Sequence, residues 1–133
     1  MSGVPQPHLP LEDADFDTLM RAHLARVFTE RNPERRLAAL EDLYAEDATL
    51  FEPQTAATGR QAISDAVDAL QASMPPGFTF TPAGPAIGHH GLAQLHWRAG
   101  PPGGPAAVTG TDVARVEGGR IRALHVFLDP KSA

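Results

Sequence analysis

The sequence of 133 residues contains no cysteine, which excludes disulfide bonds, thiolate metal sites and cysteine nucleophiles. It also has no stretch near the roughly 20 consecutive apolar residues that a membrane-spanning helix needs. The N-terminus lacks the basic start and the apolar run of a signal peptide. From these absences we expect a cytoplasmic protein without a membrane partner.

Acidic residues are missing from one long part of the chain. There are 11 basic and 16 acidic residues, a net charge of −5, and no acid lies between Asp68 and Asp112. A negative net charge gives no general attraction to phosphate backbones, so we do not expect a nucleic-acid partner. Asp112 therefore stands out as the acid that ends this acid-free stretch.

The length allows about one domain, and the 42% hydrophobic content is enough to fill one core. Residues 1–12 are rich in proline and predict a flexible arm. We therefore expect that arm, followed by a single α+β domain over residues 13–133.

Helical periodicity dominates the first half of the chain. Apolar residues recur at helical spacing over residues 16–28, 37–44 and 63–74, and Asn32 followed by Pro33 is typical of a helix start. A short β-prone piece at 48–51 precedes the third helix. After residue 77 the period changes to two, which predicts strands at 78–82, 92–99, 106–116 and 120–128. This order predicts three N-terminal helices packed on a curved antiparallel sheet, with an apolar pocket in the concavity.

Alternation along residues 108–116 places Asp112 on the same face as Val108, Ala114 and Val116. A carboxylate on such an apolar face must be paired, hydrogen-bonded or protonated. Gly118 and Gly119 predict a two-residue hairpin turn, which would place Asp112 opposite His125. A four-residue loop would keep that register, whereas a three-residue loop with a bulge would shift it by one residue.

In our interpretation Asp112 and His125 form a proton-transfer pair in the pocket, with Glu52 as a further acid or base at the rim. Two alternatives remain open. The pair could be a structural buried pair, or it could lie on a dimer face if the two faces of the sheet are reversed.

Several phrases of the sequence together are similar to one known family. They are Tyr44-Ala-Glu-Asp-Ala-Thr-Leu-Phe-Glu-Pro53, Gly59-Arg-Gln-Ala-Ile63, His96-Trp97, Thr109-Gly-Thr-Asp-Val113 and Gly119-Arg-Ile121. In this order they resemble the SnoaL-like and ketosteroid-isomerase-like branch of the nuclear transport factor 2 superfamily, over residues 16–129. The resemblance implies a cone-shaped α+β barrel with a deep apolar pocket, and a homodimer formed through the outer face of the sheet.

The resemblance also implies roles for single residues. Glu52, ahead of Pro53, matches the place of the base in ketosteroid isomerases, and Asp112 matches a protonated acid that donates to the oxyanion. Tyr44 falls where some members carry a network tyrosine, which makes it a further candidate catalytic residue. Two tyrosines of the isomerases align with Phe28 and Val67, which cannot replace their hydroxyl groups. Polyketide cyclases of the superfamily also use an Asp and a His from late strands.

The remaining candidates are apolar or histidine. His23 lies on the apolar stripe of the first helix, where a core histidine bonded to a backbone carbonyl is favoured over a ligand contact. No histidines have metal-ligand spacing, and we expect neither a metal site nor a cofactor. The predicted pocket lining is apolar and aromatic: Leu24, Phe28, Val67, Phe80, Leu95 and Trp97.

These observations predict a small cofactor-independent isomerase or polyketide-cyclase-like lyase. Its acid–base chemistry would take place next to a carbonyl group of an apolar small molecule. The alternative is a non-catalytic dimeric domain that binds a small ligand in the same cavity. Epoxide hydrolysis is a third option, but Arg98 alternates with Trp97 and is predicted to face away from the pocket.

Overall fold

The computed structural model describes residues 13–130, so the predicted arm over residues 1–12 lies outside it. Four helical segments are present: α1 (Asp13–His23), the π-helical turn η1 (Leu24–Phe28), α2 (Pro33–Leu43) and α3 (Arg60–Ala72). The strands are β1 (Tyr44–Glu52), β2 (Thr55–Thr58), β3 (Thr79–Pro82), β4 (Ile87–His89), β5 (Leu92–Gly100), β6 (Val108–Glu117) and β7 (Arg120–Leu128). The predicted class, α+β with helices packed on a sheet, is confirmed.

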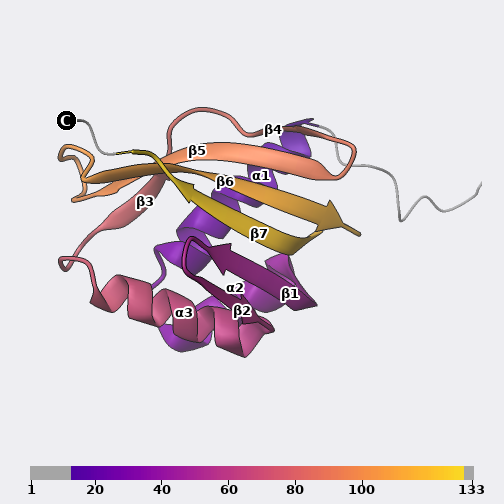
Figure 1. Cartoon of the computed structure of the whole chain (residues 1–133), viewed down its shortest axis with the longest axis horizontal. Coiled ribbons are helices and arrows are strands. Elements are labelled where there is room, and N and C mark those ends of the chain that lie inside the picture. Colours follow the sequence, from indigo (N-terminus) through magenta and orange to yellow (C-terminus); the bar gives the residue numbers. More distant parts are fainter. Residues whose placement is uncertain (1–12, 131–133) are drawn as a thin grey trace, which may run out of the picture.

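The seven strands form one sheet in the order β2-β1-β7-β6-β5-β3, and β4 pairs with β5. All pairs are antiparallel except β1 and β7, which run parallel. The sheet is therefore mixed and open, which corrects the prediction of an antiparallel sheet closed into a cone. Figure 1 shows α1 passing behind the long strands, while α2 and α3 lie beside β1 and β2. The core lies between these helices and the inner face of the sheet.

The first predicted helix is not one continuous α-helix. Periodicity predicts one helix over residues 16–28, but the chain changes from α-helix to π-helix at Leu24. A π-helical turn changes the angular spacing of side chains, and such turns are frequent at functional sites. His23 and Leu24, on either side of this change, are both fully buried. None of the helices in residues 13–130 is long and apolar enough to cross a membrane.

A buried arginine fixes the end of η1. Arg36 is fully buried and donates to the carbonyl oxygen of Glu30, to the carboxylate of Asp68 and to the side chain of Gln71. Gln71 in turn donates to the carbonyl oxygen of Phe28 at 2.8 Å. A buried charge needs such partners. Through Arg36 and Gln71, α2 and α3 therefore hold the segment that carries Phe28 in one position.

The β6–β7 hairpin contains both the predicted turn and an unpredicted bulge. Gly118 and Gly119 have φ values of 59° and 79°, as a two-residue turn requires, and Val116 faces Ile121. The next pair is Arg115 with Ala123, so Arg122 has no cross-strand partner in β6. The register of β1 against β7 is irregular at the same place, where Arg122 forms an ion pair of 3.0 Å with Asp47. Beyond the bulge the register is shifted by one residue.

Candidate functional site

A pocket of about 300 Å³ opens between the helices and the inner face of the sheet. Four of the predicted lining residues contribute to it: Leu24, Phe28, Phe80 and Trp97. Val67 and Leu95, also predicted to line it, are buried in the core but are not part of its wall. The only charged residues of its wall in the described chain are Asp112 and Glu52. The pocket is thus apolar apart from two carboxyl groups and Ser73, whose hydroxyl donates to the carbonyl oxygen of Leu70.

Asp112 lies on the buried face of β6, as the alternation predicts, and is 2% exposed. Its Oδ1 accepts a hydrogen bond of 2.8 Å from Nε1 of Trp97 on β5. Its Oδ2 lies 2.7 Å from Nε2 of His23 at the end of α1. On the other side of the imidazole ring, Nδ1 lies 2.7 Å from the hydroxyl of Tyr44 on β1.

We call these four residues, Tyr44, His23, Asp112 and Trp97, the buried tetrad. They come from four different elements and none is more than 4% exposed. Burial, together with the charge of Asp112, raises the pKa of the Tyr44 hydroxyl well above its ordinary value of 10.0. The phenol therefore stays protonated and can act only as a neutral hydrogen-bonding group at physiological pH.

Aromatic rings separate the tetrad from water. Phe28 packs edge-on against His23, with ring centroids 4.9 Å apart, and Phe80 packs against both Phe28 and Trp97. Such a shell lowers the local dielectric, which strengthens every hydrogen bond inside it. Asp112 is the member of the tetrad, besides Trp97, that also faces the pocket.

Glu52 occupies the rim at the end of β1, before Pro53, as predicted. Its side chain is half-buried, and Thr55 donates a long hydrogen bond of 3.5 Å to it. Burial raises the pKa of the Glu52 carboxyl above its ordinary value of 4.5, and the Thr55 hydroxyl opposes this shift only in part. A second carboxyl group therefore faces the same pocket in a less polar setting than water.

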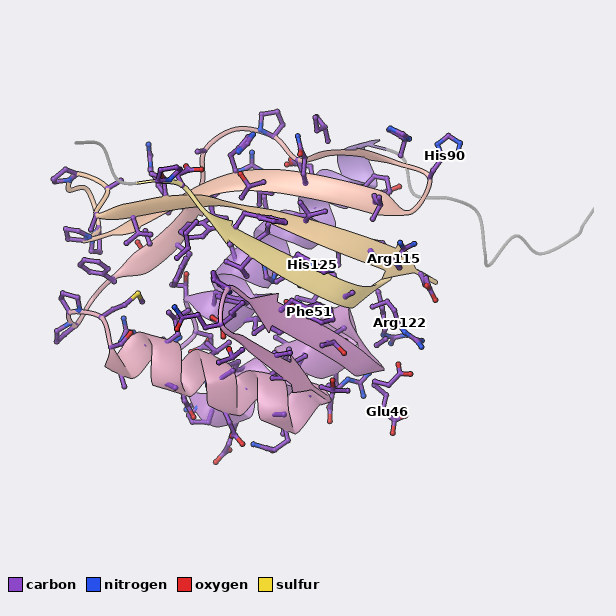
Figure 2. All side chains as sticks on the ribbon, in the orientation of Figure 1. Glu46, Phe51, His90, Arg115, Arg122 and His125 are labelled. Atoms are coloured by element: carbon purple, nitrogen blue, oxygen red, sulfur yellow. The ribbon has the colours of Figure 1, made fainter. Side chains whose placement is uncertain are left out.

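The predicted pairing of Asp112 with His125 is wrong. The bulge at Arg122 places Asp112 opposite Val126, while His125 faces Val113 on the outer side of the sheet. His125 is exposed and stacks on Phe51 with ring centroids 4.5 Å apart. Figure 2 shows these two side chains together on neighbouring strands. A one-residue shift in register moves every following side chain to the other face, which explains the error.

His23 is the residue that sequence reasoning placed in the core but did not connect to the site. It is buried as favoured, yet its partners are the side chains of Asp112 and Tyr44 rather than a backbone carbonyl. One signal could have found it. Two polar residues, Asp112 and His23, each stood on an apolar face without a local partner, and pairing them with each other satisfies both.

Within residues 13–130 no three His, Asp or Glu side chains lie close enough to hold a metal ion together. The polar groups that face the pocket are instead two carboxyl groups at different depths. Asp112 at the floor and Glu52 at the rim can exchange protons with a molecule bound between them.

Comparison with known proteins identifies one domain family. The sequence model of the SnoaL-like domain matches residues 20–124. A proposed isomerase of the SnoaL-like family from Agrobacterium tumefaciens is 30% identical, with a TM-score of 0.81 over 88% of this chain and 99% of that one. No curated protein matches.

Two further solved structures share the fold at lower identity. A proposed ketosteroid isomerase from Kribbella flavida is 17% identical, with a TM-score of 0.66 over 90% of this chain and 82% of that one. A proposed polyketide cyclase from Sinorhizobium meliloti is 19% identical, with a TM-score of 0.64 over 87% and 99%. At these identities the likeness concerns the fold alone.

Proposed function

The chain belongs to the SnoaL-like domain family, and from that premise we propose that it is a small acid–base enzyme of the isomerase or cyclase type. Its substrate would be an apolar small molecule that carries a carbonyl group. One observation carries the proposal: a carboxyl group, Asp112, lies at the floor of an apolar pocket and is held there by His23 and Trp97. Such a group is costly to bury, and acid–base catalysis is a reason to keep it.

The pocket supports a limited class of substrates. Its volume of about 300 Å³ lies at the small end of the range for ligand pockets. Two carboxyl groups and no basic residue in its described wall disfavour anions. A neutral molecule with an apolar body fits these surroundings best.

The chemistry needs only the residues of the pocket. A carboxylate takes a proton from the carbon next to the carbonyl, so that a C–H bond breaks, an O–H bond forms and the electron pair moves to the carbonyl oxygen as an enolate. Return of the proton at another carbon isomerises the substrate, whereas attack of the enolate carbon on a second carbonyl closes a ring. Asp112 and Glu52 are the two groups placed to carry out these transfers.

Hydrogen–deuterium exchange tests the proposal without knowledge of the natural substrate. A panel of small cyclic ketones is incubated with the protein in heavy water, and the loss of the proton next to the carbonyl is followed by NMR. We expect exchange above the buffer rate for at least one ketone, reduced about 10²–10⁴-fold in Asp112→Ala. The matched control is Thr111→Val, the neighbouring residue on the outer face of the same strand, which should exchange like the wild type.

A second function, binding without catalysis, is favoured by a different observation. In the described part of the chain every buried side-chain nitrogen and oxygen has a hydrogen-bond partner, so the tetrad is satisfied without a ligand. Ligand-induced shifts in the melting temperature separate the two functions. Binding of a ketone with no exchange in the wild type, and equal binding by Asp112→Ala, would support the binding domain and contradict the enzyme.

We also propose that the protein is a homodimer. Phe51 and Phe127 are partly exposed on the outer face of the sheet, on either side of His125. A second copy would cover this apolar surface. Light scattering measures the mass, and Phe127→Asp should shift a dimer toward the monomer.

A further inference from the structure

The hydrogen bonds of the buried tetrad can be assigned a direction, because two of its members leave no choice. The indole Nε1 of Trp97 carries a proton and can only donate, so Oδ1 of Asp112 accepts. The hydroxyl of Tyr44 must place its proton on an acceptor, since it is fully buried and protonated. Among the described residues its hydrogen-bond partner is Nδ1 of His23, so Tyr44 donates to that nitrogen.

The direction at Tyr44 fixes the state of His23. An imidazole whose Nδ1 accepts a hydrogen bond is neutral and carries its proton on Nε2. That proton points at Oδ2 of Asp112, 2.7 Å away. Both oxygens of Asp112 therefore accept from N–H groups, and hydrogen bonds to the charged form of a carboxyl group favour that form.

From this chain of donors we infer that Tyr44 is a positioning residue, which acts through His23 to keep Asp112 ionised, so that Asp112 is the base of the pocket. The family resemblance implies the opposite role, a protonated acid that donates to the oxyanion. The catalytic half of the inference rests on the proposed function. The structural half, the tautomer of His23 and the charge of Asp112, does not.

The surroundings of Asp112 leave few other groups to consider. His23 faces it from α1 and Trp97 from β5, with Tyr44 of β1 behind the imidazole, and Glu52 shares the pocket from the end of β1. No Lys or Arg lines the described wall of the pocket. Removal of the Tyr44 hydroxyl frees Nδ1 to carry the proton instead, and Nε2 would then accept a proton from Asp112.

Nitrogen-15 NMR of the histidine rings in the full chain tests the structural half. The signal of His23 is assigned by its loss in His23→Gln. We expect the Nε2–H tautomer in the wild type and a population of the Nδ1–H tautomer in Tyr44→Phe. Phe28→Leu is the matched control, because it removes a ring packed on His23 but no hydrogen bond, and should leave the tautomer unchanged.

An infrared difference spectrum between the wild type and Asp112→Asn reads the charge of Asp112 directly. At neutral pH we expect no protonated-carboxyl band in the wild type and such a band in Tyr44→Phe. A protonated Asp112, or a His23 that carries its proton on Nδ1, in the wild type would overturn the inference whether or not the protein turns over any ketone.

The exchange assay tests the catalytic half. If Asp112 is the base, Asp112→Asn loses about 10²–10⁴-fold of the exchange rate; if it is a donor, Asn retains the rate because its amide can still donate. Tyr44→Phe should move the acidic limb of the pH–rate profile to higher pH and regain the wild-type rate above it, whereas a merely structural role would lower the rate equally at every pH. If no ketone exchanges while the tautomer is as expected, the proposed function fails and the catalytic half is overturned with it, but the donor chain stands.

Discussion

Two histidine contacts of equal length lie on opposite faces of β6. His23 reaches Asp112 at 2.7 Å on the inner face, and His96 reaches the neighbouring Thr111 at 2.7 Å on the outer face. The inner histidine is fully buried, whereas His96 is exposed. Water can replace the partners of the outer pair, whereas it does not reach His23 of the inner pair.

The difference shows why distance alone does not measure the importance of a hydrogen bond. An exposed bond exchanges with water at little net cost, so the His96–Thr111 contact should contribute little to stability. A buried partner that loses its bond keeps its full desolvation cost. On the inner face, the loss of one polar group therefore leaves its partners buried without a hydrogen bond. On the outer face, the loss of one polar group has little effect on the stability contributed by its neighbours.

The largest expected effect comes from removing the inner histidine. His23→Leu leaves the hydroxyl of Tyr44 and one oxygen of Asp112 without a partner in the core, and should lower the free energy of unfolding by about 3–5 kcal/mol. Urea denaturation followed by circular dichroism measures this change. The matched variant His96→Leu should change the stability by less than about 0.5 kcal/mol. Equal losses of unfolding free energy in the two variants would show that burial does not decide how much each hydrogen bond contributes to stability.

An alkaline titration examines the tetrad through the only tyrosine of the chain. Because the pKa of Tyr44 is raised in the folded state, its contribution to stability is present below pH 10.0 and is lost as the pH rises through the folded value. Above pH 10.0 the stability should fall by up to about 1.4 kcal/mol per pH unit. We expect tyrosinate absorbance to appear together with unfolding. Ionisation near pH 10.0 in the folded protein would contradict the burial of the hydroxyl.

Glu52 lies between the two faces, since it borders the inner pocket and an outer hollow beside His125. Its raised pKa means that its contribution to stability is present below pH 4.5 and is lost as the pH rises through the folded value. Glu52→Gln should therefore gain stability relative to the wild type as the pH rises above 4.5. Melting temperatures over that range measure the gain. Glu46→Gln, an exposed position on the same strand, is the control and should show no such trend.

Element types could be predicted from the sequence where a period repeats often enough. The strands β5 to β7 lie within about two residues of their predicted limits and the third helix within about three, because each contains several repeats of its period. β2 and β4 are not predicted, since they contain only four and three residues. β3 is as short as β2, but it lies at the start of the predicted period-two pattern that follows residue 77. The parallel pairing of β1 with β7 was also missed, because strand order depends on packing between segments far apart in the chain.

The candidate site was predictable in part for the same reason. The buried position of Asp112 follows from local alternation, and so does its need for a partner. The partner itself does not follow, because His23 is 89 residues away and reaches β6 only through the packing of α1. The hairpin turn was predicted correctly, but one inserted residue, Arg122, decided which face His125 occupies.

The smallest expected effect is at His125, the residue that the bulge moved to the outer face. His125→Ala removes a stacking contact with Phe51 on a surface that water reaches, so the free energy of unfolding should change by less than about 0.5 kcal/mol. The exchange rate of a ketone substrate should equal that of the wild type, because the side chain does not border the pocket of Asp112. A homodimer formed through this face would instead respond in light scattering. If His125→Ala loses the hydrogen–deuterium exchange activity while His23→Gln keeps it, the catalytic histidine lies on the outer face. The roles proposed for the two faces would then be reversed.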